Sequence, residues 1–206
     1  EKNSSALPLT SFDGTKLQNH FFKNPRTGPF HPTVIFEPPW FSRTRFFQDI
    51  IRFLNEDLGF NVLTLEHRNL YSRSLCLLDH AGAWDLHGAA EFLKARRKEY
   101  GVDAEKIMAY GLSLGGINAI RAASLKNSPL STIIVQAIPV TFEASFRRTF
   151  RKLFFELSSS VYEDRAIKYL KLLLVEALSY YHGIAISKEE ALPRPFEMLE
   201  KINPKI

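Results

Sequence analysis

The sequence predicts an α/β fold in which a mainly parallel sheet carries helices on both faces and is followed by a helical cap. Three observations support this prediction. Short apolar runs alternate with segments of helical spacing as far as Pro139. The apolar runs are continuous, as in parallel strands that are buried on both faces. Beyond Pro139 the helical patterns continue, and no convincing strand interrupts them.

The strands are expected in a simple order along the chain. The turn signal Asp13-Gly14 separates two strand-like segments, residues 9–12 and 16–22, and predicts a hairpin at one edge of the sheet. The later apolar runs predict the strands of the parallel part of the sheet, over residues 33–36, 60–65, 107–110 and 132–138.

The helices are expected between these strands. Two of them precede a glycine, Gly59 or Gly101, and glycine readily adopts the left-handed conformation that ends many helices. Strands and helices that alternate at this length are typical of βαβ units. The helical spacing covers residues 46–58, 83–100 and 113–125.

The chain is expected to divide near residue 140. Residues 1–140 are predicted to form the N-terminal part of the sheet domain, and residues 141–201 the helical cap. Three helical patterns support the cap, near residues 143–157, 161–182 and 187–201.

Composition and charge narrow the class of protein. The 206 residues are 45% hydrophobic and 24% charged, which is ordinary for a globular domain. The net charge is +5, and the densest basic stretch, residues 147–152, is interpreted as the solvated face of a helix. No nucleic-acid partner is therefore expected.

The compartment is predicted to be the cytoplasm. The single cysteine, Cys76, excludes an internal disulfide, which fits a reducing compartment. The first residues lack the apolar core of a signal peptide, although a leader removed before Glu1 would change this prediction. No apolar run approaches the roughly 20 residues that span a bilayer. The most apolar stretch, residues 168–181, is expected to be a buried helix or a cap helix.

The stretch GLSLGG, residues 111–116, places three glycines around Ser113 where an apolar run becomes a helix. Ligands of open α/β sheets bind at the carboxyl ends of the strands, where this serine is expected. A nucleophilic serine on a tight strand-to-helix turn needs small neighbours, and Gly111 and Gly115 meet that need. The N–H of Leu114 would then be an oxyanion donor. The alternative is a plain turn in which Ser113 caps the helix.

Five segments in order resemble one family along the whole chain: SFDGTKLQNHFF, TVIFEPPW, GFNVLTLEHRNLYSRS, WDLHGAAEFL and GLSLGG. They resemble the α/β-hydrolase superfamily, in the branch of lipase-like serine esterases with a helical cap. The resemblance implies hydrolysis of an ester, thioester or similar small acyl substrate, with Ser113 on the nucleophile elbow and Leu114 as an oxyanion donor. No cofactor is implied, and no metal-binding motif is present.

One departure from the family concerns the oxyanion turn. Residues 37–40 read EPPW where the family usually has His-Gly. Direct alignment places the second oxyanion donor on Pro39, which has no N–H. The N–H of Trp40 becomes the donor if the register slips by one residue, and Phe41 is a further alternative. Trp40 is equally interpreted as a wall of the acyl pocket or as a packing residue, the more common role of a tryptophan.

The second departure concerns the catalytic triad. The family order is serine, then an acid, then histidine, and the last two follow strands after the cap. Residues 202–206 look like the lead-in to the first of those strands, so both positions are expected beyond Ile206. Glu143, Asp164 and His182 are the substitutes within the chain, although a structural role is the more common one for such residues. A sheet without its last strands would expose an apolar edge open to association.

Two further expectations follow from the same segments. Asp85 is predicted to contact the loop that carries Arg68 and to fix that loop near the elbow. The departures at the oxyanion turn and the triad also leave a second hypothesis, a non-catalytic binding or regulatory protein on the same scaffold. A nucleotide-binding domain is excluded, because no G-x-G-x-x-G follows the first strand.

Overall fold

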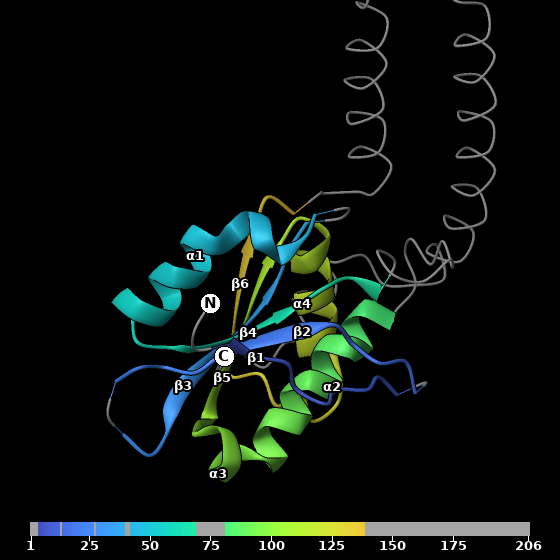
Figure 1. Ribbon diagram of the computed structural model, residues 1–206. Helices are drawn as coiled ribbons and strands as arrows, with labels where there is room; N and C mark the ends of the chain where they lie inside the picture. The colour runs from blue at the N-terminus through green and yellow to red at the C-terminus, as the bar shows by residue number, and fades with distance from the viewer. Residues whose placement is uncertain (1–3, 13, 27, 40–41, 69–80, 139–206) are drawn as a thin grey trace, which may run out of the picture. The chain divides into compact units, whose positions relative to one another are not determined.

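The computed structural model describes residues 4–12, 14–26, 28–39, 42–68 and 81–138. Six strands of this part form one sheet in the order β1-β2-β4-β3-β5-β6 (Figure 1). Strands β3 to β6 run parallel to one another, whereas β2, near one edge, runs antiparallel to both of its neighbours, β1 and β4. The predicted mainly parallel sheet is therefore confirmed. The strands are β1 (Ser4–Ser5), β2 (Asn19–Phe22), β3 (His31–Glu37), β4 (Asn61–Leu65), β5 (Val102–Leu112) and β6 (Thr132–Gln136).

The central strands are buried on both faces, as their continuous apolar runs predict. Every residue of β4 is buried, and so is β3 from Thr33 to Glu37. These two strands pair in parallel with Val34 opposite Val62. In β6 exposed and half-buried residues alternate instead, which is typical of a strand with one open face.

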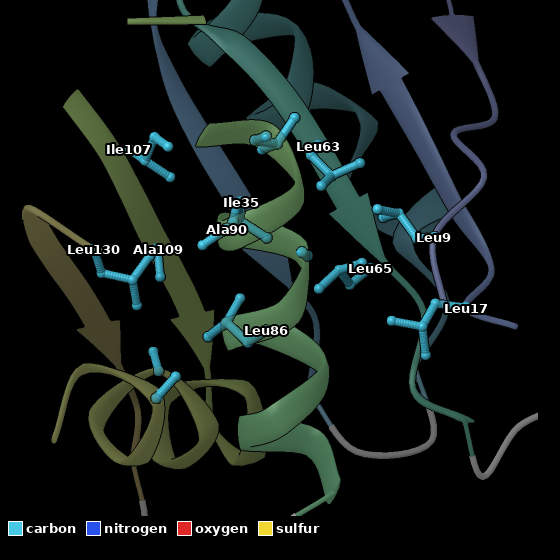
Figure 2. Close-up of a cluster of buried hydrophobic side chains, with 14 of the residues drawn as sticks. Leu9, Leu17, Ile35, Leu63, Leu65, Leu86, Ala90, Ile107, Ala109 and Leu130 are labelled. Carbon is cyan, nitrogen blue, oxygen red and sulfur yellow. The ribbon is translucent and has the colours of Figure 1, made fainter. Parts of the chain in front are cut away.

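Helices cover both faces of the sheet, as predicted (Figure 1). On one face, Ile51 and Leu54 pack with Val34 and Phe36. On the other face, α2 and α4 bury a larger apolar cluster, and Figure 2 shows Ala90 of α2 beside Ile35 of β3. Successive side chains of β3 thus enter opposite cores, which follows from the two-residue period of a strand. The helices of the described part include α2 (Ala81–Ala95), α3 (Arg97–Tyr100) and α4 (Leu114–Ser124).

The helix predicted over residues 46–58 changes pitch twice. It begins as a 3₁₀ turn, η1 (Thr44–Phe47), continues as α1 (Gln48–Arg52) and ends as a π turn, η2 (Phe53–Asp57). The wide last turn is closed by the Leu58 N–H, which donates to the carbonyl of Phe53. Gly59 follows with a φ of 76°, as expected for the residue that ends a helix.

The helix predicted over residues 83–100 is divided as well. Arg96 leaves the helical conformation between α2 and α3, with φ −101° and ψ 21°. Gly101 then ends α3 with a φ of 66°, which confirms the predicted glycine stop.

The predicted hairpin of residues 9–22 is wrong in its extent. Its turn is present, because the Ser11 N–H donates to the carbonyl of Thr15 and the Leu17 N–H to that of Leu9, but among the described residues here the pairing amounts to one isolated bridge between Thr10 and Lys16. The buried side chain of Asn19 binds the backbone of Leu7 and Leu17, so a side chain replaces the ladder at this point. The ladder itself forms between β2 and its neighbours β1 and β4.

The predicted cap over residues 141–201 and the lead-in over 202–206 lie outside the described residues. Within the described ranges no helix is both long enough and apolar enough to cross a membrane.

Candidate functional site

Ser113 lies between the last residue of β5 and the first residue of α4. Its φ of 54° and ψ of −112° form a conformation that residues with a side chain rarely adopt. The Ser113 N–H donates to the carbonyl of Gln136 at 2.9 Å, while the N–H groups of Gly116 and Ile117 donate to the Ser113 carbonyl at 3.0 and 3.2 Å. Such a conformation costs about 1–3 kcal/mol and persists only where the surroundings impose it. Here the hydrogen bonds to β6 and within α4 impose it.

The hydroxyl of Ser113 does not cap the helix. Ser113 occupies the N-cap position of α4, yet its side chain makes no capping hydrogen bond. The alternative considered from the sequence, in which the side chain of Ser113 caps the helix, is therefore wrong, because the capping hydrogen bond does not form. Ser113 as a whole is half-buried.

The glycines around Ser113 are required by close packing, which confirms the predicted need for small neighbours. A Cβ on Gly111 would fall within 3.0 Å of the Gly115 backbone, a separation that Cβ atoms essentially never show. A Cβ on Gly115 would lie 2.9 Å from the carbonyl oxygen of Pro38 and closer still to that of Glu37. The first turn of α4 thus lies directly against the end of β3.

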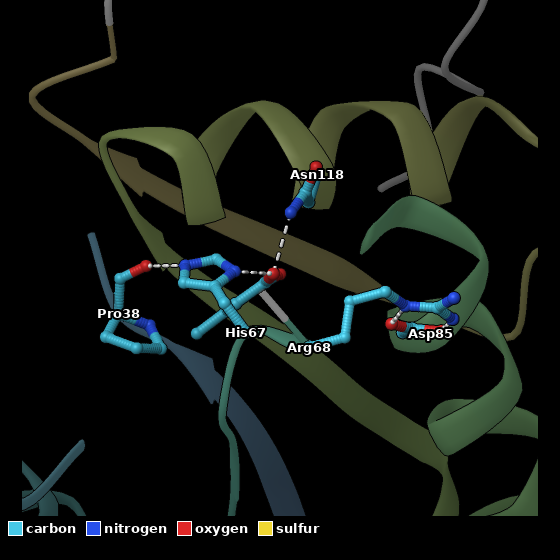
Figure 3. Close-up of polar contacts among 6 residues, drawn as sticks. Pro38, His67, Arg68, Asp85 and Asn118 are labelled. Atoms are coloured by element: carbon cyan, nitrogen blue, oxygen red, sulfur yellow. Dashed lines mark hydrogen bonds and ion pairs between the residues drawn. The ribbon is translucent and has the colours of Figure 1, made fainter. Parts of the chain in front are cut away.

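The turn after β3 is held by a buried polar network (Figure 3). Oε1 of Glu37 accepts a hydrogen bond from Nδ2 of Asn118 at 2.7 Å and lies 3.2 Å from Nδ1 of His67. Nε2 of the same imidazole lies 2.6 Å from the carbonyl oxygen of Pro38. Both ring nitrogens of His67 therefore face oxygen atoms that accept hydrogen bonds, and the protonated imidazolium satisfies both.

The environment shifts the titration of both groups. Burial raises the pKa of the Glu37 carboxyl, although the hydrogen bond to His67 and its charge oppose that effect. Burial by itself would lower the pKa of His67, but the hydrogen bond to Glu37 and its charge, with the Pro38 carbonyl, outweigh burial and raise it. Both groups thus hold their protons more tightly than in an unfolded chain.

Three consecutive residues after β4 each contact a different neighbour. Glu66 accepts hydrogen bonds from the N–H of Thr44, at 2.9 Å, and from the Thr44 hydroxyl. His67 reaches the turn after β3, as described above. Arg68 donates from Nε to Oδ2 of Asp85 at 2.8 Å and forms a second contact with the other carboxylate oxygen. The predicted contact between Asp85 and the loop of Arg68 is confirmed.

The structure brings together only part of the residues expected at the site. Ser113 and Leu114 are adjacent at the junction of β5 and α4. The other candidates lie outside the described residues: Trp40, Glu143, Asp164 and His182. Among the described residues, no three metal-ligating side chains converge on one point.

The pair of Glu37 and His67 is not predicted from the sequence, because the sequence pattern indicates only that His67 lies in a loop. The signal lies in the strand order. Glu37 ends one apolar strand and His67 closely follows the next, and the carboxyl ends of neighbouring parallel strands meet at the same edge of a sheet.

Known proteins resemble the chain in structure. No protein-family model and no curated protein sequence matches it. The esterase Pf2001 of Pyrococcus furiosus is similar with a TM-score of 0.62 and 20% identity, over 83% of this chain and 61% of that one. A bacterial heroin esterase gives 0.56 and 17%, over 65% and 43% of the two chains. Brefeldin A esterase gives 0.56 and 17%, over 71% and 44%.

The chain thus spans about half of the length of these structures. What they share with it is the fold, which in this chain is a mainly parallel sheet with helices on both faces. The chain therefore has the α/β-hydrolase fold.

Proposed function

We propose that the full protein is a serine hydrolase that acts on an ester, thioester or similar acyl substrate, with Ser113 as its nucleophile. The observation that carries the proposal is the backbone of Ser113, which is held at φ 54° while its hydroxyl is left without a capping contact. A strained conformation imposed on a reactive side chain is typical of functional sites, because a plain turn would relax it. The esterase structures that share the fold support the proposal of an ester hydrolase.

In the proposed reaction, Oγ of Ser113 attacks the acyl carbonyl carbon and gives its proton to a general base. The negative charge then moves to the former carbonyl oxygen. The N–H of Leu114 is available to that oxygen, because the first amides of a helix have no partner within the helix. The tetrahedral intermediate collapses, releases the alcohol or thiol and leaves an acyl group on Ser113, which water removes.

The remaining parts of the proposed machinery come from segments outside the described residues. We place the second oxyanion donor at the amide of Trp40 and keep the helical cap over residues 141–201 as a proposal. Glu143, Asp164 and His182 are the candidates for acid and base within the chain. Strand β6 is last in the order of the described sheet, and its outer edge is the proposed place for association with a further strand.

A fluorophosphonate probe tests the nucleophile directly, since it reacts covalently with activated serines. We expect the full protein and its Ser124→Ala variant to be labelled, and the Ser113→Ala variant to remain unlabelled. Ser124 is a matched control, because it is a half-buried serine at the other end of the same helix. Labelling of Ser113→Ala at the rate of the wild type would refute the assignment of the nucleophile.

A second candidate function is a binding protein that keeps the scaffold without the chemistry. The observation that favours it is Pro39, which lacks the N–H that the aligned position normally supplies. A folded full chain that resists the probe, yet melts at a higher temperature in the presence of a short acyl ester, would support this candidate over the hydrolase.

A further inference from the structure

The buried pair of Glu37 and His67 has no part in the chemistry proposed above. Both side chains are almost fully enclosed, at 5% and 6% exposure. A buried ion pair is weak evidence for a contribution to stability, because desolvation offsets much of the attraction between the charges. Its position, at the turn after β3 and against α4, suggests a different role.

The network closes a ring around the entrance of α4. Asn118 of α4 binds Glu37, Glu37 contacts His67, and His67 contacts the carbonyl of Pro38 (Figure 3). The ring returns to α4 at Gly115, which lies against that same carbonyl. Asn118 thus links the end of β3 to α4, and His67 joins Glu37 to the carbonyl of Pro38, so the turn after β3 is held on both sides.

The orientation of the Pro38 carbonyl matters for an oxyanion. A carbonyl oxygen carries partial negative charge, so it would repel an oxyanion if it rotated toward the position that the oxyanion occupies. Its hydrogen bond with Nε2 of His67 holds this oxygen in place, and thereby the orientation of the peptide that leads to Pro39. The next amides along the turn are the ones that can serve as the second oxyanion donor.

We propose that His67 is a positioning residue, which holds the Pro38 carbonyl through Nε2 while Glu37 holds Nδ1, and so orients the turn after β3 for oxyanion binding. This inference rests on the proposed function of Ser113. The raised pKa of His67 agrees with it, because a protonated ring donates from both nitrogens. Glu66 and Asp85 add negative charge near the pair.

Two substitutions separate the two nitrogens of the ring. The amide nitrogen of glutamine can take the place of Nε2, so His67→Gln keeps a donor for Pro38. The amide nitrogen of asparagine can take the place of Nδ1, so His67→Asn keeps a donor for Glu37 and loses the one for Pro38. The measured quantity is the second-order rate constant for fluorophosphonate labelling of Ser113 in the full chain, with circular dichroism to confirm that both variants fold.

We expect His67→Asn to label about 10- to 100-fold more slowly than the wild type, which is the range for a displaced oxyanion donor. His67→Gln is expected to be labelled at least about tenfold faster than His67→Asn. Equal rates in the wild type and His67→Asn would overturn the inference. Equal losses in both variants would overturn it as well, because the bulk of the ring, and not the Nε2 donor, would then control the rate.

A second measurement does not depend on Ser113 reactivity. Nitrogen-15 NMR of the imidazole in Ser113→Ala is expected to show a proton on Nε2 of His67 at neutral pH, and an Nε2 without a proton would overturn the inference. If the wild type is not labelled at all, the proposed function fails, and the role of His67 in oxyanion binding is refuted with it. The NMR result then still decides whether His67 holds the turn.

Discussion

Replacement of Gly115 by alanine tests how tightly the start of α4 packs against the end of β3. The new Cβ would lie 2.9 Å from the carbonyl oxygen of Pro38 and closer still to that of Glu37, whereas ordinary contact begins at 3.4 Å, so the end of β3 must retreat by more than about 0.5 Å. The atoms that must move belong to the backbone, which places the clash in the upper part of the usual range of about 1–3 kcal/mol for overpacking. Alanine regains up to about 1 kcal/mol of helix propensity.

The net expectation for Gly115→Ala is a loss of about 1–2 kcal/mol in the free energy of unfolding. For a chain of 206 residues this lowers the melting temperature by about 2–8 °C. Thermal unfolding followed by circular dichroism measures it. We also expect slower labelling of Ser113, because the displaced turn no longer faces the elbow.

Gly88 provides the matched control for this prediction. It lies inside α2, and a Cβ there would meet no atom within 4 Å. Gly88→Ala should therefore raise the free energy of unfolding by about 0.5–1 kcal/mol through helix propensity alone. If Gly115→Ala melts at or above the temperature of the wild type, the turn after β3 moves without cost, and the argument that packing requires Gly115 is refuted.

Two further predictions concern the buried charges. Asp85→Asn removes the carboxylate that faces the guanidinium of Arg68, whose side chain is only 12% exposed, and should lower the free energy of unfolding in urea by about 3 kcal/mol. The control is Glu99→Gln in an exposed ion pair, which should change nothing measurable. Equal effects of the two substitutions would contradict the buried pair. Because the folded chain raises the pKa of His67 above 6.5, protonation of His67 stabilises the folded state. This contribution to the free energy of unfolding is complete below pH 6.5 and is lost as the pH rises through the pKa of the folded state. NMR titration should find that pKa above 6.5, and a lower value would contradict the network.

Much of the sheet could be predicted from the sequence, because its strands are short, apolar and buried on both faces. The run at residues 60–65 differs from β4 by a single residue. The packing around Ser113 could be predicted too, since three glycines within six positions indicate close backbone contacts. The contact between Arg68 and Asp85 followed from a resemblance that covers both segments.

Other features depend on tertiary contacts that spacing does not reveal. The π turn of η2 coincides with a side-chain hydrogen bond from Asn55 to the carbonyl of Phe60, and no local pattern indicates it. The pair of Glu37 and His67 joins residues 30 positions apart, and it becomes visible only when β3 and β4 are known to be neighbours. The extent of the first hairpin depended on the side chain of Asn19, whose identity alone does not show that it replaces a ladder.

The packing around Ser113 directly constrains its glycine neighbours. Gly111, Gly115 and Gly116 each lie where a methyl group would collide with backbone or with Ile138. During divergence, a change at any of these glycines would have to be accompanied by movement of α4, of β3 or of the segment that follows β6. In a comparison of relatives the glycines would therefore trace the packing of the scaffold, whereas residue 113 would trace the proposed chemistry.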